Sequence, residues 1–260
     1  MRGEDGAAFR PWKPGPQLRG WLAAAAEVVW PRTTLDGADA AGSVGWSGAA
    51  WAQVSFLDAP WCARCGLPFE HDRGPDAACP PCEARPPAFD RARAACLYDD
   101  RSRELVLQFK HGDRLEHARL FAGWLSRVGR ELLVDADAVA PVPLHGSRLL
   151  KRRYNQAAEI ARPICKLHGK RYLPDALVRV KAGGQAGRSA SGRRREVQGA
   201  FAVPDARRAQ VEGRRILLVD DVMTTGATAE ACARVLKKAG ASAVDVVVVA
   251  RVPDPRDVTI

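Results

Sequence analysis

The stretch that decides the fold is Arg215-Ile-Leu-Leu-Val-Asp220-Asp221-Val-Met-Thr224-Thr225-Gly226-Ala-Thr228. Its first half is a run of aliphatic residues, which is typical of a strand buried on both faces of a parallel sheet. The strand ends in two acids, and a short Thr/Gly loop then leads into a helix that we expect over residues 227–239. Ligands of open α/β sheets bind at such strand ends. The stretch therefore predicts an α/β domain with a binding site after this strand.

The loop after the two acids has the features of a phosphate site. At a helix N-terminus, unpaired backbone N–H groups and the helix dipole favour an anion, and Gly226 permits a close approach. Asp220 and Asp221 would repel a phosphate, so they suit ribose hydroxyls or an Mg²⁺ ion. The alternative is a loop whose Asp and Thr side chains only cap the helix, but a cap needs a single such residue. This loop has two acids, three threonines and a glycine within nine positions. Because neither a Gly-Lys-Ser/Thr nor a GxGxxG motif occurs, a P-loop and a dinucleotide fold are excluded.

The rest of the second half alternates strands and helices. We expect helices over 102–130 and 155–167, and strands over 88–98, 138–144, 216–219 and 244–250. Aliphatic strands separated by helices of this length predict a parallel sheet covered by helices on both faces.

The net charge is concentrated in one segment. The chain has 260 residues, with 40 Lys and Arg against 30 Asp and Glu, which gives a formal net charge of +10. Residues 141–201 alone hold 14 basic and 3 acidic side chains, so the rest of the chain is close to neutral. Such a block indicates an anionic partner, either phosphate groups or nucleic acid.

Four cysteines are spaced as metal ligands. Cys62-Ala-Arg-Cys65 and Cys79-Pro-Pro-Cys82 form two CxxC pairs across a 13-residue loop. Two such turns complete a closed tetrahedral S4 shell, which predicts a structural zinc ion; two independent redox pairs are the alternative. Gly66 suits a turn that aims backbone N–H groups at the sulfurs. The three single cysteines stand within apolar patterns and are expected to be buried: Cys96, Cys165 and Cys232.

These patterns divide the chain into two domains. We expect an N-terminal module over residues 1–87, with the zinc knuckle at 62–82 and a short helix at 17–29, and an α/β domain over 88–260. No membrane span of roughly 20 mostly apolar residues and no secretory signal is recognisable. Since the cysteine usage also suits a reducing compartment, we predict a cytoplasmic protein without membrane insertion.

Several of these motifs resemble one family. Residues 219–228 are similar to the PRPP-binding motif of type I phosphoribosyltransferases. Further segments in the same order resemble the ComF family of competence-associated proteins: Val142-Pro-Leu-His145, Asn155-Gln156-Ala157, Gln185 and Gly199-Ala-Phe201. The resemblance covers residues 30–252. It implies a type I phosphoribosyltransferase fold preceded by a small zinc-ribbon-like module, and a link to competence, DNA uptake and natural transformation.

The resemblance also implies roles for individual residues. The acids would bind the ribose 2′ and 3′ hydroxyls of PRPP, with Mg²⁺, and the loop would cradle its 5′-phosphate; the residues are Asp220, Asp221, Met223, Thr224, Thr225, Gly226, Ala227 and Thr228. Arg148 and Arg152 would pair with the pyrophosphate, and a solvated basic helix start is the alternative. Residues 181–195 resemble the mobile lid of this fold, with Arg193 matching the family's arginine, although their composition also fits a flexible linker.

The chain departs from the family pattern in places. Longer ComF relatives carry a further cysteine knuckle, where this chain has the CxxC-like spacing without cysteine, at Thr34, Gly37, Ser47 and Ala50. This alignment predicts that residues 34–50 are a degenerate first knuckle that has lost its metal. Two further departures lie in or next to the lid-like segment 181–195: Arg188 stands where an apolar residue is expected, and Glu196 stands where Asn is expected.

Three functions remain open from the sequence. As an enzyme of nucleoside metabolism, the chain would displace pyrophosphate from C1 of PRPP in a pentosyl transfer. As a sensor, it would bind PRPP or a nucleotide without turnover. As an adaptor, it would handle single-stranded DNA, in a salt-dependent manner, or hold DNA-uptake and recombination proteins.

Overall fold

The computed structural model describes residues 52–111, 116–144, 154–181 and 197–252. The expected helix at 17–29 and the degenerate knuckle at 34–50 lie outside these ranges. The described residues belong to a compact unit that begins at Ala52. Within this unit the cysteine segment packs directly against the α/β sheet. The domain boundary between residues 87 and 88 stays a prediction.

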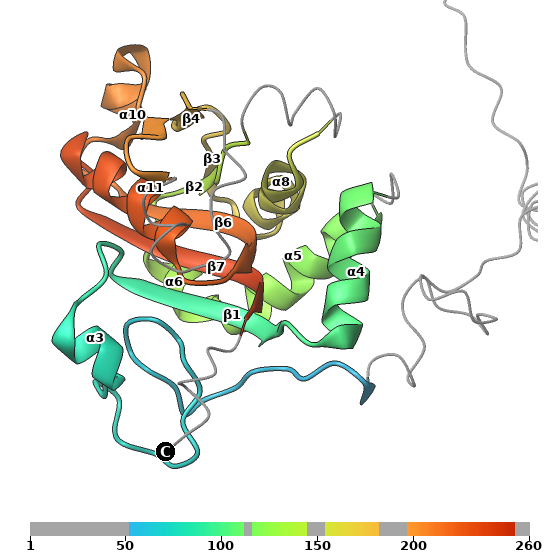
Figure 1. Cartoon of the computed structure of the whole chain (residues 1–260). Helices are drawn as coiled ribbons and strands as arrows, with labels where there is room; N and C mark the ends of the chain where they lie inside the picture. Colours follow the sequence, from blue (N-terminus) through green and yellow to red (C-terminus); the bar gives the residue numbers. More distant parts are fainter. Residues whose placement is uncertain (1–51, 112–115, 145–153, 182–196, 253–260) are drawn as a thin grey trace, which may run out of the picture. The chain divides into compact units, whose positions relative to one another are not determined.

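Five strands form the central sheet, in the order β1-β7-β6-β2-β3, and each neighbouring pair is parallel (Figure 1). β6 and β7 are the longest aliphatic runs of the sequence, and β7 is buried along nearly its whole length. Burial on both faces explains why these strands lack an alternating pattern. The predicted parallel α/β sheet is confirmed, and its strands are β1 Arg91–Leu97, β2 Ala138–Pro141, β3 Arg171–Tyr172, β6 Arg215–Met223 and β7 Ala243–Arg251.

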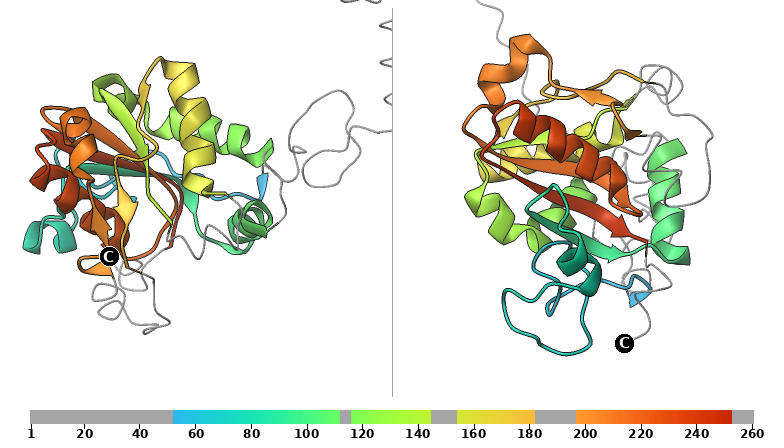
Figure 2. Two further views of the ribbon diagram at one scale, coloured as in Figure 1. Left: turned by 90° about the horizontal axis from the view of Figure 1, so that it is seen from above. Right: turned by 60° about the vertical axis from the view of Figure 1, so that its left-hand side comes forward.

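Helices cover both faces of this sheet. α5 and α8 pack together on one face, and α11 lies on the other (Figure 1, Figure 2). The crossover from β2 to β3 and the crossover from β6 to β7 run in opposite directions along the sheet, and right-handed connections then place their helices on opposite faces. The bounds are α4 Asp100–His111, α5 Glu116–Val128, α6 Arg130–Asp135, α8 Gln156–His168 and α11 Ala227–Lys238. No described helix has the length and apolarity that a membrane crossing needs.

Short elements are where the structure differs from the expectations. Of the single helix expected over 102–130, the described residues form α4 and α5, and residues 112–115 lie outside the described ranges. The sequence patterns missed the two-residue strands, because two residues show no periodicity. One of them is β3, and the other two, β4 Val178–Arg179 and β5 Phe201–Ala202, form a separate antiparallel pair. The remaining short elements are α3 Pro80–Ala84, the 3₁₀ helix η1 Asp205–Arg207 and α10 Arg208–Val211.

The segment ahead of the cysteines adds to the edge of the sheet. The N–H of Leu57 donates to the Ala95 carbonyl, and the N–H of Leu97 donates to the Ser55 carbonyl, both at 2.9 Å. An isolated antiparallel bridge lies between these two contacts. The outer edge of β1 is therefore covered at its carboxyl end, and the chain enters the cysteine knuckle already bound to the sheet.

Candidate functional site

Two loops meet at the carboxyl end of the sheet. β2 and β6 are neighbours, but the chain leaves β2 toward β3 and leaves β6 toward β7. In open α/β sheets such a reversal opens a crevice in which ligands bind. The N–H of Val142 donates to the Val219 carbonyl at 2.9 Å, and Asn155 Nδ2 donates to the Val142 carbonyl at 3.0 Å. Both ends of the loop after β2 are therefore held beside β6.

Asp220 and Asp221 end the aliphatic part of β6 at this crevice, and both are half-buried. The N–H of Asp221 donates to Asp220 Oδ1 at 2.9 Å, which orients the first carboxylate. The pKa of the Cys232 thiol in α11 is well above its usual range, mainly because the thiol is buried and to a smaller extent because of the negative charge of Asp220. The Asp220 carboxylate therefore lies close enough to α11 to act on a group within that helix.

The loop Thr224–Gly226 leads from β6 into α11. Gly226 is the N-cap of α11 in a left-handed conformation, with φ 71°, and no side chain of the described residues caps the helix. The Gly226 carbonyl accepts the Glu230 N–H at 2.9 Å, which starts the helical hydrogen bonds. Thr225 Oγ1 is buried and has no hydrogen-bond partner among the described residues. An uncapped helix start beside an unpaired hydroxyl is an arrangement that accepts an anion.

The three arginines expected at the pyrophosphate lie outside the described residues: Arg148, Arg152 and Arg193. The ends of their segments are described. The first segment runs from β2 to α8, where Asn155 Oδ1 caps the helix by accepting the Ala157 N–H at 3.1 Å. The second connects β4 to β5, and β5 packs against α11. Both segments thus depart from elements near the loop after β6, and the arginine positions stay predictions.

The four knuckle cysteines come together in space. Their Sγ atoms all lie within 4.8 Å of one another, and all four cysteines are free. The Cys65 and Cys79 sulfurs are 3.6 Å apart, close to the ~3.8 Å that Zn–S bonds of ~2.3 Å imply in a tetrahedral shell. Cys62 Sγ accepts backbone N–H groups from Cys65 at 3.4 Å and from Cys79 at 3.2 Å. The donor set therefore fits a metal ion.

Close contact between the sulfurs also separates their pKa values. Hydrogen bonding with Cys65 holds the pKa of Cys62 well below its usual range, whereas contact with Cys62 raises the pKa of Cys82 far above its usual range. Like charges at this spacing oppose ionisation, and a bound cation is what allows all four thiols to become thiolates. The remaining cysteines, which are buried as expected, belong to the sheet and helices.

Gly66 brings the knuckle close to β1. The turn aims the Cys65 N–H at a sulfur as expected, while the N–H of Gly66 itself donates to the Cys62 carbonyl at 2.9 Å. Gly66 has φ 68°, and a Cβ added to it would lie 2.4 Å from the Ala92 carbonyl oxygen. Two residues earlier, the Arg64 carbonyl accepts the Ala92 N–H at 2.6 Å. A glycine is required here because two backbones touch.

Replacing Gly66 with alanine is expected to lower the free energy of unfolding by about 2–3 kcal/mol, because the left-handed φ and the clash with the β1 backbone add. Gly74→Ala is the matched control: Gly74 lies in the same knuckle at φ 92°, but an added Cβ meets nothing within 4 Å. We expect about 1 kcal/mol there, from the φ alone. Urea denaturation of both variants measures the difference, and equal losses would show that the contact with β1 is not constraining.

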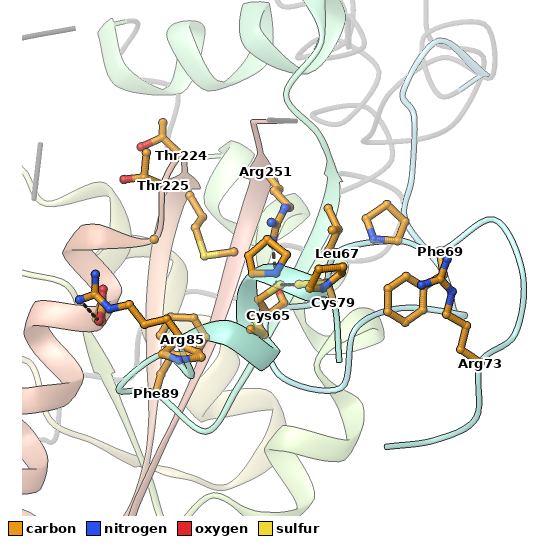
Figure 3. Close-up of a pocket in the computed structure, with 18 of the residues that line it drawn as sticks. Cys65, Leu67, Phe69, Arg73, Cys79, Arg85, Phe89, Thr224, Thr225 and Arg251 are labelled. Carbon is orange, nitrogen blue, oxygen red and sulfur yellow. Dashed lines mark hydrogen bonds and ion pairs between the residues drawn. The ribbon is translucent and has the colours of Figure 1, made fainter. Parts of the chain in front are cut away.

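A cavity of about 500 Å³ lies between the cysteine knuckle and the loop after β6 (Figure 3). Cys65 and Cys79 line one side, and the loop with Met223 lines the other. The sequence patterns did not point to Arg85 or Arg251, which also line it. Arg251 had a usable signal, since it is a charged residue directly after a buried aliphatic run, as Asp220 is in β6. Arg85 had none, because only the packing of the knuckle brings it there.

Known proteins are similar to this chain in sequence. The phosphoribosyl transferase domain family matches residues 148–259. The DNA utilization protein YhgH of Escherichia coli is 30% identical over 208 residues, which cover 75% of this chain and 86% of that protein. Competence protein F of Haemophilus influenzae is 29% identical over 200 residues, which cover 75% of this chain and 86% of that protein.

Solved structures show weaker matches. The hypoxanthine phosphoribosyltransferase of Staphylococcus aureus is 15% identical with a TM-score of 0.35, and the match covers 56% of this chain and 69% of that one. The allosteric regulatory enzyme of purine biosynthesis is 23% identical with a TM-score of 0.36. That match covers 55% of this chain and only 30% of the enzyme.

The parallel sheet, its strand–acid–acid–loop–helix unit and the domain match define a type I phosphoribosyltransferase fold, here joined to a four-cysteine knuckle. Within this class the sequence relatives are more specific. The chain belongs to the ComF family. The fold and the family implied by the sequence motifs are both confirmed.

Proposed function

We propose that the chain binds PRPP, with the 5′-phosphate on the loop after β6 and the ribose hydroxyls on Asp220 and Asp221. The observation that supports this most is the loop itself, because within the described residues no side chain caps α11 and Thr225 Oγ1 is buried without a hydrogen-bond partner. A phosphate would accept hydrogen bonds from both. The carboxylates only accept hydrogen bonds, so they suit the hydroxyls. PRPP presents a phosphate and two such hydroxyls on one ribose ring.

The other expected contacts follow from this placement. Thr224 and Thr228 would add hydroxyl donors around the 5′-phosphate, and Met223, Gly226 and Ala227 would contribute their backbone. Mg²⁺ would neutralise charge between the pyrophosphate and the ribose oxygens. Arg148, Arg152 and Arg193 would pair with the pyrophosphate. This arrangement would concentrate the basic segment 141–201 around one highly anionic ligand.

We infer that the ion of the cysteine cluster is zinc, at one ion per chain. Tetrahedral sets of four thiolates select zinc or iron. All four positions are filled by protein sulfur, which leaves no open position for catalysis and makes the site structural. A cytoplasmic, reducing compartment would keep the thiols available. Metal analysis of the purified protein distinguishes zinc from iron.

Turnover would be a pentosyl transfer in which an acceptor displaces pyrophosphate from C1 of PRPP. Positioning and electrostatic stabilisation would supply most of the catalysis, because the transition state develops charge on the ribose and on the leaving pyrophosphate. Release of pyrophosphate in the presence of nucleobases distinguishes a transferase from a PRPP sensor. The names of the relatives support a place for either activity in DNA uptake and natural transformation.

Exchanging both acids for amides, Asp220→Asn with Asp221→Asn, is expected to weaken PRPP binding about 100-fold, since each hydrogen bond to a charged group contributes about 1.5–3 kcal/mol. Isothermal titration calorimetry with PRPP and Mg²⁺ measures this. Asp205→Asn with Asp76→Asn removes the same charge at two exposed positions and is expected to leave the affinity unchanged. A similar loss in both double variants would mean that net charge, and not the site, binds the ligand.

The second candidate function is single-stranded DNA handling, which the basic segment 141–201 and the names of the relatives favour. Phosphate contacts of that kind would weaken steeply with salt. They would not need the carboxylates of β6. Salt-sensitive binding of an oligonucleotide that survives the Asp220/Asp221 exchange would therefore support DNA handling over PRPP binding.

A further inference from the structure

The cysteine cluster and the loop Thr224–Gly226, here called the phosphate loop, line two sides of one cavity. Figure 3 shows Thr224 and Thr225 at one end of the view, Phe69 and Arg73 at the other, and Cys65, Cys79 and Arg251 between them. The two sites come from segments more than a hundred residues apart in the sequence. Contacts that join the two sides could therefore transmit a change from one side of the cavity to the other.

Arg251 touches both walls. It is the last residue of β7 and lies in register opposite Met223, the last residue of β6. The next N–H, of Val252, donates to the Met223 carbonyl at 2.9 Å. The Arg251 side chain turns the other way, and its Nη1 donates to the Cys65 carbonyl at 2.8 Å (Figure 3). One residue thus joins the start of the phosphate loop to the first CxxC turn.

A second and weaker contact joins the same walls. Arg85 caps the short helix α3, which carries Cys82, and its Nη2 lies 3.5 Å from Glu230 Oε1 in the first turn of α11. The Arg85 side chain is 59% exposed, so solvent screens this ion pair. Glu230 is also paired with Arg234 within α11 and is held without Arg85. Arg251 is therefore the stronger of the two links.

We propose that Arg251 is a positioning residue that couples the metal in the cysteine cluster to the ligand on the phosphate loop, so that zinc and PRPP bind cooperatively. An ordered CxxC turn fixes the position of the Cys65 carbonyl, and this carbonyl accepts the hydrogen bond of the Arg251 guanidinium. Because Arg251 pairs with Met223 between β7 and β6, its position also orders the backbone that leads into Thr224. Each ligand then favours the same arrangement of the strand ends, and binding of either one strengthens the other by the same factor. The ligand part of this inference rests on the proposed PRPP function.

The coupling is measured as a ratio of zinc affinities. Competition with a zinc chelator, with and without saturating PRPP, is expected to show about tenfold tighter zinc binding when PRPP is present. In Arg251→Met the protein still binds zinc, and the ratio falls to about one. Arg73→Met is the matched control, because Arg73 lines the same cavity but stacks on the Phe69 ring, 5.0 Å from its centroid. Among the described residues, no hydrogen bond or ion pair joins Arg73 to the loop after β6. A ratio of one in the wild-type protein, or an unchanged ratio in Arg251→Met, overturns the coupling.

A second measurement needs no PRPP. In zinc-loaded protein, amide hydrogen exchange over residues 222–226 is expected to be about tenfold faster in Arg251→Met than in the wild-type protein, and unchanged in Arg73→Met. Unchanged exchange in Arg251→Met overturns the positioning role. If zinc-loaded wild-type protein bound no PRPP at all, the proposed function would fail, together with the cooperativity. The exchange result would still decide whether Arg251 orders the loop.

Discussion

Replacing Asp245 with asparagine is expected to lower the free energy of unfolding by about 3–5 kcal/mol, because two partly buried guanidinium groups lose their counter-charge. The Asp245 side chain is 0% exposed. It accepts hydrogen bonds from Arg91 Nε at 3.1 Å and Nη2 at 2.7 Å, and from Arg215 Nη1 at 2.9 Å. The same carboxylate raises the pKa of Arg91 above its usual range. Urea denaturation followed by circular dichroism measures the loss.

Asp135→Asn is the matched control for this change. Asp135 accepts from the same Arg91 Nη2, also at 2.7 Å, but its side chain is 45% exposed. Ion pairs at exposed sites contribute about 0–1 kcal/mol, so a loss in that range is expected. Losses of the same size in both variants would mean that burial does not set the cost of breaking these pairs.

This charge cluster lies at the opposite end of the sheet from the candidate site. Arg91 and Arg215 begin β1 and β6, and Asp245 is near the beginning of β7. Ligands of open α/β sheets bind at the carboxyl ends of the strands. The amino ends are therefore available for contacts that serve stability alone, and here a buried carboxylate joins three adjacent strands. The amino ends of these strands thus contribute to stability, whereas their carboxyl ends form the candidate site.

The long elements were predictable because burial dictates their composition. β6, β7, α8 and α11 follow from aliphatic runs, helical periodicity and end signals such as Asn155 before α8. The two-residue strands were not predictable, because they are defined by pairing with a neighbouring strand and not by their composition. Asp245 shows the same limit. In the sequence it is an acid that interrupts a valine run, and only the fold brings Arg91 and Arg215 to it.

The candidate site was predictable where one segment holds all of its residues. The cysteine pairs and the loop after β6 each carry their spacing within about twenty residues. The cavity between them was not, because Arg85 and Arg251 come from separate segments and meet only after the knuckle packs on β1. Tertiary contact is the missing information in both cases. Local motifs therefore identified the walls of the site but not the space between them.

Replacing Cys62 with serine is expected to reduce the zinc content from the proposed one ion per chain to nearly none and to unfold the knuckle locally. Cys62 is fully buried, and its Sγ accepts two of the backbone N–H groups that shape the cluster. In small zinc modules the metal contributes about 10–16 kcal/mol, which is most of their folding free energy. The sheet has its own aliphatic core and is expected to persist. Metal analysis and amide hydrogen exchange measure both effects.

Cys165→Ala is the control for this change. Burial raises the pKa of Cys165 to about 11, so it stays a protonated thiol inside α8, and its loss should leave zinc content and knuckle protection unchanged. If knuckle amides in Cys62→Ser were as protected as in the wild-type protein, contacts with β1 alone would hold the knuckle. The expected loss of protection would instead mean that the ion, through the knuckle, maintains the wall of the cavity that faces the loop after β6.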